Sequence, residues 1–133
     1  MSDERRTVLV VEDDAPLRRM IGVFLRAAGY RVCAAEDGPT GLALARDERP
    51  DLVLLDLMMP GLDGWEVLRR IKGEALTAAI PVLVLTASVD APLTEQALRL
   101  GVTRFLTKPI DSRVLVESVD AVVGQTEGQE ERL

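Results

Sequence analysis

The sequence predicts an α/β fold: a doubly wound parallel sheet of five strands in the order 2-1-3-4-5, with helices on both faces. Five short apolar runs alternate along the chain with five segments of helical periodicity. This alternation requires parallel strands joined by right-handed crossovers. The first, third and fourth runs are the most apolar and belong at the centre of the sheet, whereas the second and fifth are mixed and belong at its edges.

Each strand is expected where an apolar or β-branched run meets a polar or turn-forming residue. Leu52 to Leu55 is apolar without alternation, which is typical of a strand covered on both faces, and Asp56 ends it. The winding reverses between the first and third strands, and ligands of such sheets bind at the carboxyl ends of the strands near that point. The expected strands cover residues 8–11, 31–35, 52–56, 82–86 and 104–108.

The helices are expected between these strands. Asp13 or Asp14 is expected to cap the first helix, and Gly124 to stop the fifth. The helices are predicted at about 15–28, 38–48, 64–72, 91–100 and 112–123. The apolar positions expected to face the core include Met20 on the first helix and Val114, Leu115, Val119 and Val122 on the fifth.

The composition limits the classes of function. A net charge of −6 argues against broad binding of nucleic acid or anionic membranes. The absence of histidine excludes Ser-His-Asp and Cys-His catalysis and argues against a typical zinc site. The single cysteine, Cys33, excludes an internal disulfide, and no signal peptide or membrane-spanning run is visible. We therefore expect a cytoplasmic protein with no direct nucleic-acid contact and no membrane insertion.

Polar side chains stand at the carboxyl ends of four predicted strands. Glu12 and Asp13 follow the first strand, Asp56 ends the third, Thr86 ends the fourth and Lys108 ends the fifth. Carboxylates held close together repel one another, so a cation is expected among them. Oxygen ligands suit a hard ion such as Mg²⁺, which keeps several waters and shares phosphate oxygens with the protein.

These residue types favour acceptance of a phosphoryl group by Asp56. A carboxylate beside Mg²⁺ stays ionised and can attack phosphorus, and aspartyl phosphate is a recognised covalent intermediate. Mg²⁺ and Lys108 would neutralise charge on the transferring group, and Thr86 could donate to one of its oxygens. The chain has fourteen arginines, which we assign mostly to solvated surface, and only two lysines, so that Lys108 stands out.

Several motifs occur together at the expected strand ends. They are Val-Val-Glu12-Asp13-Asp14, Asp56-Leu-Met-Met-Pro60-Gly61-Leu-Asp-Gly64, Leu-Thr86-Ala87 and Phe105-Leu-Thr-Lys108-Pro109. With these motifs in this order, the chain resembles the receiver (CheY-like) domain of bacterial two-component response regulators over about residues 7–124. The resemblance implies a flavodoxin-like fold for this domain, and we expect a disordered segment at 1–6 and a polar tail or linker start at 125–133.

The resemblance also implies how the acidic residues act. Asp56 would be the phosphoacceptor for a sensor histidine kinase or a phosphotransfer protein. Asp13 and Asp56 would bind Mg²⁺ together with the backbone carbonyl of Met58, while Glu12 would assist through water. The chain would not be an enzyme in the usual sense, with at most weak self-phosphorylation from small donors and weak autodephosphorylation.

A second group of roles concerns the response to phosphorylation. By the same resemblance, Lys108 would pair with the phosphoryl group, and Thr86 and Phe105 would form the switch pair. The switch would alter the face made by the fourth helix, fifth strand and fifth helix, and an unknown downstream protein would read it. We expect no DNA-binding output domain in these 133 residues.

The chain departs from the family pattern at a few positions. Glu12 stands where aspartate is frequent, and Met58 and Ser88 occupy positions that tune dephosphorylation in the family. Residues 102–104, Val-Thr-Arg, replace a frequent small-acidic-acidic run that some DNA-binding members use for salt bridges across a dimer. We therefore expect a monomer or a weak phosphorylation-dependent dimer.

Two other classes of function compete with this reading. The first is a receiver-like protein-binding module that is not phosphorylated, against which the complete acid set, Thr86 and Lys108 argue. The second is an enzyme on a similar fold, such as a flavin protein or a DxD phosphatase. The acids at 12–14 would repel a flavin phosphate, and Asp56 has no second acid two residues later.

Overall fold

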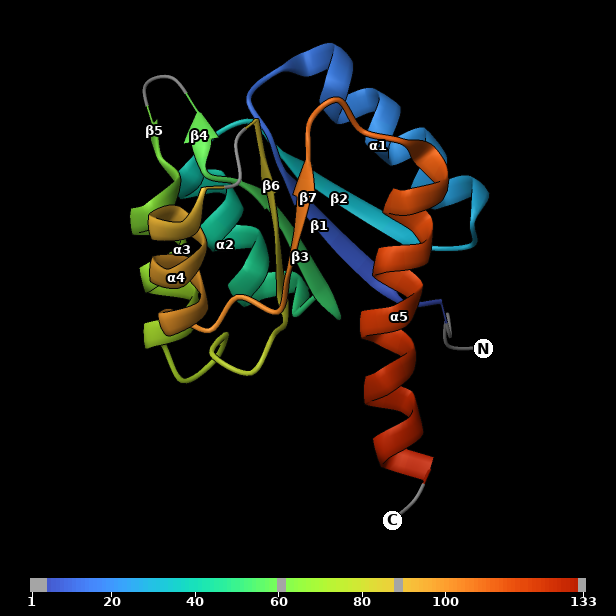
Figure 1. Ribbon diagram of the computed structural model, residues 1–133. Helices are drawn as coiled ribbons and strands as arrows, with labels where there is room; N and C mark the ends of the chain where they lie inside the picture. Colours follow the sequence, from blue (N-terminus) through green and yellow to red (C-terminus); the bar gives the residue numbers. More distant parts are fainter. Residues whose placement is uncertain (1–4, 60–61, 88–89, 132–133) are drawn as a thin grey trace.

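The computed structural model describes residues 5–59, 62–87 and 90–131 (Figure 1). Its main sheet has five parallel strands in the order β2-β1-β3-β6-β7, which confirms the predicted order 2-1-3-4-5. The strands are β1 (Thr7–Val11), β2 (Arg31–Ala35), β3 (Leu52–Asp56), β6 (Val82–Thr86) and β7 (Arg104–Thr107).

A second, two-stranded sheet was not predicted. The strands β4 (Met58–Met59) and β5 (Leu62–Asp63) pair antiparallel directly after β3. Two-residue strands carry too few residues for a periodic pattern, so the sequence offered no sign of them. The β4–β5 pair occupies the connection between Asp56 and α3 (Gly64–Gly73).

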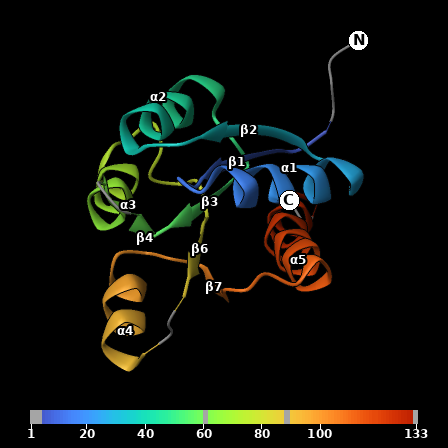
Figure 2. The ribbon, with the colours of Figure 1, turned by 90° about the horizontal axis from the view of Figure 1, so that it is seen from above.

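Helices cover both faces of the main sheet, as expected (Figure 2). The helices α1 (Ala15–Ala27) and α5 (Ser112–Glu131) pack on one face through Ile21, Leu25, Leu115 and Val119. On the opposite face pack α2 (Gly38–Glu48), α3 and α4 (Ala91–Arg99), through residues that include Leu42, Leu68, Ile71 and Ala97.

The central strands supply both cores because alternate side chains point to opposite faces. On β1, Val8 and Val10 face α1 and α5, whereas Leu9 and Val11 face α2 and α3. Each of these four side chains is fully buried. Burying an aliphatic side chain of this size stabilises the fold by about 1.5–3 kcal/mol before entropy is counted, so the apolar runs at the centre hold the strand ends in place.

The helix ends agree with the sequence in most places. Asp90 accepts a hydrogen bond from the Leu93 amide at 2.8 Å, and Asp111 accepts one from the Arg113 amide at 2.8 Å. Gly29 and Gly101 end their helices with φ of 100° and 96°, which favour glycine.

Three expectations about the helices were wrong. Asp14 is the N-cap residue of α1 but its side chain makes no capping hydrogen bond; its ψ is 107°, whereas Asp90, which does cap its helix, has a ψ of 161°. Met20 and Val114 were expected to face the core, but they are 37% and 46% exposed. Val114 precedes the buried Leu115, and consecutive helix positions lie about 100° apart.

The last helix also continues past Gly124, to Glu131. Gly124 is not among the described glycines with positive φ, and the residues after it are rich in glutamine and glutamate, which favour helix. Within the described residues, we find no helix that is both long and apolar enough to span a membrane.

Candidate functional site

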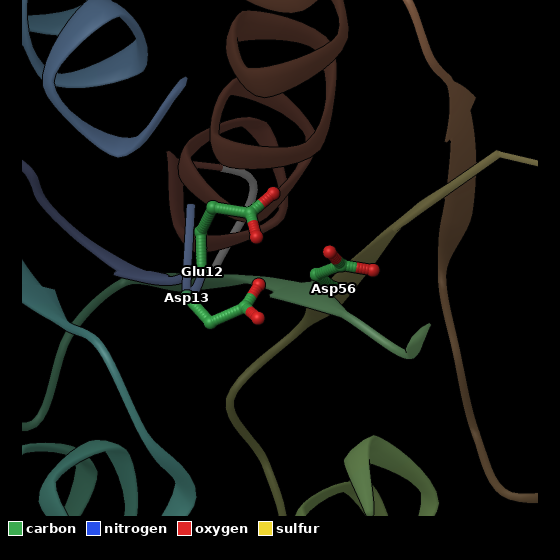
Figure 3. A group of neighbouring side chains, drawn as sticks. All are labelled: Glu12, Asp13 and Asp56. Atoms are coloured by element: carbon green, nitrogen blue, oxygen red, sulfur yellow. The ribbon is translucent and has the colours of Figure 1, made fainter. Parts of the chain in front are cut away.

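The carboxyl ends of the central strands lie level with one another. Val11 pairs with Leu55, Asp56 with Leu85, and Thr86 with Thr107. Glu12 and Asp13 follow β1 directly, and Asp56 is the last residue of β3. The structure therefore brings the three carboxylates together, and Figure 3 shows their side chains converging between the two strand ends.

The Asp56 carboxylate is buried and held by two donors. Its side chain is 1% exposed. One oxygen, Oδ1, accepts a hydrogen bond from the Met58 amide at 2.9 Å. The other, Oδ2, accepts one from the Lys108 ammonium at 2.7 Å. Both oxygens are thus oriented by groups from neighbouring segments, β4 and the end of β7.

Glu12 is fully buried beside Asp56. Its Oε1 lies 3.0 Å from Lys108 Nζ, and its Oε2 accepts a hydrogen bond from the Asp14 amide at 3.3 Å. Burial raises the pKa of Glu12 to about 7; the Lys108 ammonium lowers it, and Asp13 and Asp56 raise it further. The carboxyl of Glu12 is therefore protonated far more readily than that of an ordinary glutamate.

Lys108 links the two most buried acids. Burial by itself would lower the pKa of this lysine, but the hydrogen bonds and charges of Asp56 and Glu12 outweigh burial and raise it. Its backbone amide donates to the Thr86 carbonyl at 2.9 Å, and its peptide bond to Pro109 is cis. The lysine is thus charged and fixed to the end of β6.

The acidic cluster is suited to a metal ion. Glu12, Asp13 and Asp56 each present a carboxylate oxygen, and these oxygens lie within 4.8 Å of one another. In the described part of the chain, the buried Oε1 of Glu12 has no aligned hydrogen-bond donor, despite its ion pair with Lys108. An unsatisfied buried carboxylate oxygen in an all-oxygen donor set is what a hard divalent cation would bind, so the cluster can hold a metal.

The other predicted site residues surround this cluster. Thr86 is fully buried at the end of β6. Phe105 is half-buried and packs against the core on the α2–α3–α4 face. The Met58 side chain is 60% exposed, and its backbone amide, not its side chain, contacts Asp56. Pro60, Gly61 and Ser88 lie outside the described residues.

The sequence reading missed one contact at the site. Arg18, which we had assigned to the solvated surface, donates from Nη1 to the carbonyl of Glu12 at 2.8 Å and to that of Asp13 at 3.4 Å. A basic residue in the second turn of a helix is common on any surface, so the sequence carried no signal for this role.

Comparison with known proteins agrees with the geometry. The model of the response regulator receiver domain family matches residues 8–120. The chain is 42% identical to the phosphate regulon transcriptional regulatory protein PhoB of Pseudomonas aeruginosa, covering 91% of this chain and 53% of PhoB. It is 37% identical to protein PilH of the same organism, covering 87% of this chain and 96% of PilH. The chain thus spans about half of one relative and nearly all of the other.

Solved structures give the same result. The chemotaxis protein CheY4 of Vibrio cholerae superposes with a TM-score of 0.85 at 30% identity, covering 89% of this chain and 98% of CheY4. The receiver domain of the sensor histidine kinase PA1611 of Pseudomonas aeruginosa, solved with magnesium in its active-site cleft, has a TM-score of 0.81 at 30% identity, covering 90% and 98%. With the family match over most of its length, the chain belongs to the response regulator receiver domain family.

Proposed function

We propose that this chain is a phosphoacceptor of two-component signal transduction and that Asp56 is the residue phosphorylated. The observation that carries the proposal is the environment of Asp56: a buried carboxylate at a strand end, 2.7 Å from a lysine ammonium and beside two further acids. A carboxylate in an ordinary structural role would not need a lysine shared with a second buried acid.

In the proposed reaction, an Asp56 carboxylate oxygen attacks the phosphorus of a phosphohistidine. The new bond joins that oxygen to phosphorus, and the bond from phosphorus to the donor's imidazole nitrogen breaks. The nitrogen keeps the electron pair and takes up a proton from solvent. The Met58 amide and Lys108 orient the attacking carboxylate, and the Lys108 charge stabilises the negative charge on the transferring group.

Mg²⁺ is the cation we propose for the acidic cluster, held by Asp13 and Asp56 with the Met58 carbonyl and assisted by Glu12. When bound, it would supply positive charge to phosphoryl oxygens and keep Asp56 ionised. Lys108, which contacts Asp56 Oδ2 before transfer, would contact the phosphoryl group once that group is attached to Asp56.

The proposed output is a change in the face formed by α4, β7 and α5. This proposal is supported by the positions of Thr86, at the end of β6, and Phe105, on the adjacent strand β7, which is part of this face. Phosphorylation would shift a pre-existing equilibrium between two arrangements of this pair. A sensor histidine kinase or phosphotransfer protein would act upstream, in the cytoplasm, and a protein partner would read the face.

The test is the mass of the intact protein after incubation with Mg²⁺ and acetyl phosphate. We expect an adduct of roughly 80 Da, one phosphoryl group, that survives acid and is lost in base. Asp56→Asn should abolish the adduct, since the nucleophile is gone. Asp47→Asn, which changes an exposed aspartate on α2, should leave it intact.

The experiment also separates the competing reading. An adduct that persists in Asp56→Asn would place the acceptor elsewhere. No adduct with acetyl phosphate or with a phosphorylated kinase, in a protein that binds its partner nonetheless, would favour a module that works without phosphorylation.

A further inference from the structure

The turn between β1 and α1 carries two of the three acids, and Arg18 is bonded to its backbone. The guanidinium reaches back from the second turn of α1 to the carbonyls of Glu12 and Asp13, at 2.8 Å and 3.4 Å from Nη1. These carbonyls belong to consecutive peptide planes that flank the Cα of Asp13. Holding both planes fixes the backbone angles of Asp13, and with them the direction in which its carboxylate leaves the chain.

The three acids are held in different ways. The Asp56 carboxylate accepts hydrogen bonds from Met58 and Lys108, and the Glu12 carboxylate from Asp14. Asp13 is only half-buried, and Arg18 constrains it through its backbone. The other ties of this turn are the Glu12 amide, which donates to the Ala35 carbonyl at 3.0 Å, and the Arg18 amide, which donates to Asp14 at 2.8 Å. The carbonyls of Glu12 and Asp13, which Arg18 contacts, lie in the chain between these two hydrogen-bonded groups.

The charge of Arg18 is directed to carbonyls and not to carboxylates. Among the described residues its guanidinium forms no ion pair with Glu12, Asp13 or Asp56. The guanidinium thus occupies none of the three carboxylates, and its contribution to the cluster is geometric. A nearby positive charge would by itself weaken cation binding, so the geometric and the electrostatic effects of Arg18 have opposite signs.

We propose that Arg18 is a positioning residue for the divalent-cation site, which it preorganises by fixing the backbone on both sides of Asp13. This inference rests on the proposed function, because it presumes that Mg²⁺ occupies the acidic cluster. Residues that orient metal ligands without touching the metal commonly change its affinity by about 10–100-fold. Arg18 acts one step further away, through the backbone, so about a three- to tenfold effect is expected.

The test is calorimetric titration of the magnesium-free protein with Mg²⁺, comparing Arg18→Ala with Arg19→Ala. Arg19 is the exposed neighbour of Arg18 on the same helix, and its replacement by alanine removes the same charge. Arg18→Ala should raise the Kd for Mg²⁺ about three- to tenfold, whereas Arg19→Ala should leave it within about twofold. Arg18→Lys, which keeps the charge and most of the stem, should give an intermediate Kd because an ammonium cannot hold both planes as a guanidinium does.

Thermal melts with and without Mg²⁺ separate positioning from general stability. A positioning role predicts that the rise in Tm caused by Mg²⁺ is smaller in Arg18→Ala than in Arg19→Ala, whatever the two melting temperatures are without metal. Unchanged or tighter Mg²⁺ binding in Arg18→Ala, or full affinity in Arg18→Lys, would overturn the inference and leave the proposed function standing. If the unaltered protein bound no Mg²⁺, the proposed metal site would fall, and the role of Arg18 with it.

Discussion

At the scale of single residues, Glu12 is the most unusual group of the molecule. Its carboxyl is fully buried, shares one lysine with Asp56, and occupies a position where the family often has aspartate. The extra methylene carries the charge further from the backbone while the turn still places it near the cluster. Because the pKa of Glu12 is raised, we expect the binding of a cation to the acidic cluster to depend on pH.

The stability of the magnesium-free protein should therefore depend on pH through Glu12. The pKa of this carboxyl is 4.5 when unperturbed and about 7 in the fold. Between these two pH values the folded state holds a proton on Glu12 that the unfolded state has released. The contribution of Glu12 to the free energy of unfolding is therefore fully present below pH 4.5 and is lost as the pH rises through about 7. As the pH rises across this window, the free energy of unfolding should fall further in the unaltered protein than in Glu12→Gln. The difference between the two decreases should be on the order of 2 kcal/mol.

Urea denaturation in the presence of a chelator, at a series of pH values, checks this expectation. Glu36→Gln, at an exposed glutamate, is the matched control and should keep the full pH dependence. Parallel pH profiles for Glu12→Gln and the unaltered protein would contradict a raised pKa at Glu12. Affinity for Mg²⁺ should rise with pH over the same window, because a protonated carboxyl is a poor metal partner.

At the scale of elements, the contact between α3 and the end of β3 holds the strand that carries Asp56. Gly64, the first residue of α3, lies so close to β3 that a Cβ there would come within 2.6 Å of the Leu57 Cα and 2.7 Å of the Asp56 carbonyl. These are backbone atoms, so they cannot rotate away. The helix can approach the site only because this residue has no side chain.

Gly64→Ala should consequently destabilise the fold by roughly 2–4 kcal/mol, through overpacking against backbone. Gly73→Ala, at the other end of the same helix, has no atom within 4 Å of its added Cβ. It should be neutral or stabilising by up to about 1 kcal/mol, since alanine favours helix over glycine. Chemical denaturation of both variants measures the difference in their free energies of unfolding. Equal stability of the two variants would show that the backbone at the β3–α3 contact can shift to accept a Cβ at little cost.

The elements also show where local pattern was informative. All five predicted strands of the main sheet and all five helices exist, because each is long enough to show either a short apolar run bounded by polar residues or a helical period of 3.6. The β4–β5 pair and the extension of α5 past Gly124 were missed. The strands of the first are too short to show a period. In the second, Gly124 does not have the positive φ with which a glycine ends a helix, so α5 continues.

At the scale of the whole molecule, our expectation about dimers concerns the face of α4, β7 and α5. Thr103 and Arg104 are exposed at the start of β7, where some relatives of the family carry acids for salt bridges across a dimer. Without those acids a dimer through this face loses complementary charge, which sets specificity and orientation at interfaces.

We accordingly expect the protein treated with Mg²⁺ and beryllofluoride, which mimics the phosphorylated state, to remain chiefly monomeric at micromolar concentration. Sedimentation velocity measures this directly, with the untreated protein as reference. A tight dimer formed only after treatment would contradict the expectation, and Arg104→Ala would then show whether β7 lies in its interface.

The class of fold, the strand order and the set of residues at the strand ends follow from the sequence alone, because they depend on periodicity, relative apolarity and the rule that parallel strands end at one edge. How those residues meet is visible only in the folded chain. Lys108 contacts Asp56, 52 positions earlier in the chain, and Glu12, earlier still, while Arg18 contacts the nearby turn that carries Asp13. The Lys108 contacts depend on distances between segments that are remote in sequence, and the Arg18 contacts depend on the conformation of a turn. Neither burial nor a shifted pKa exists until these segments have packed.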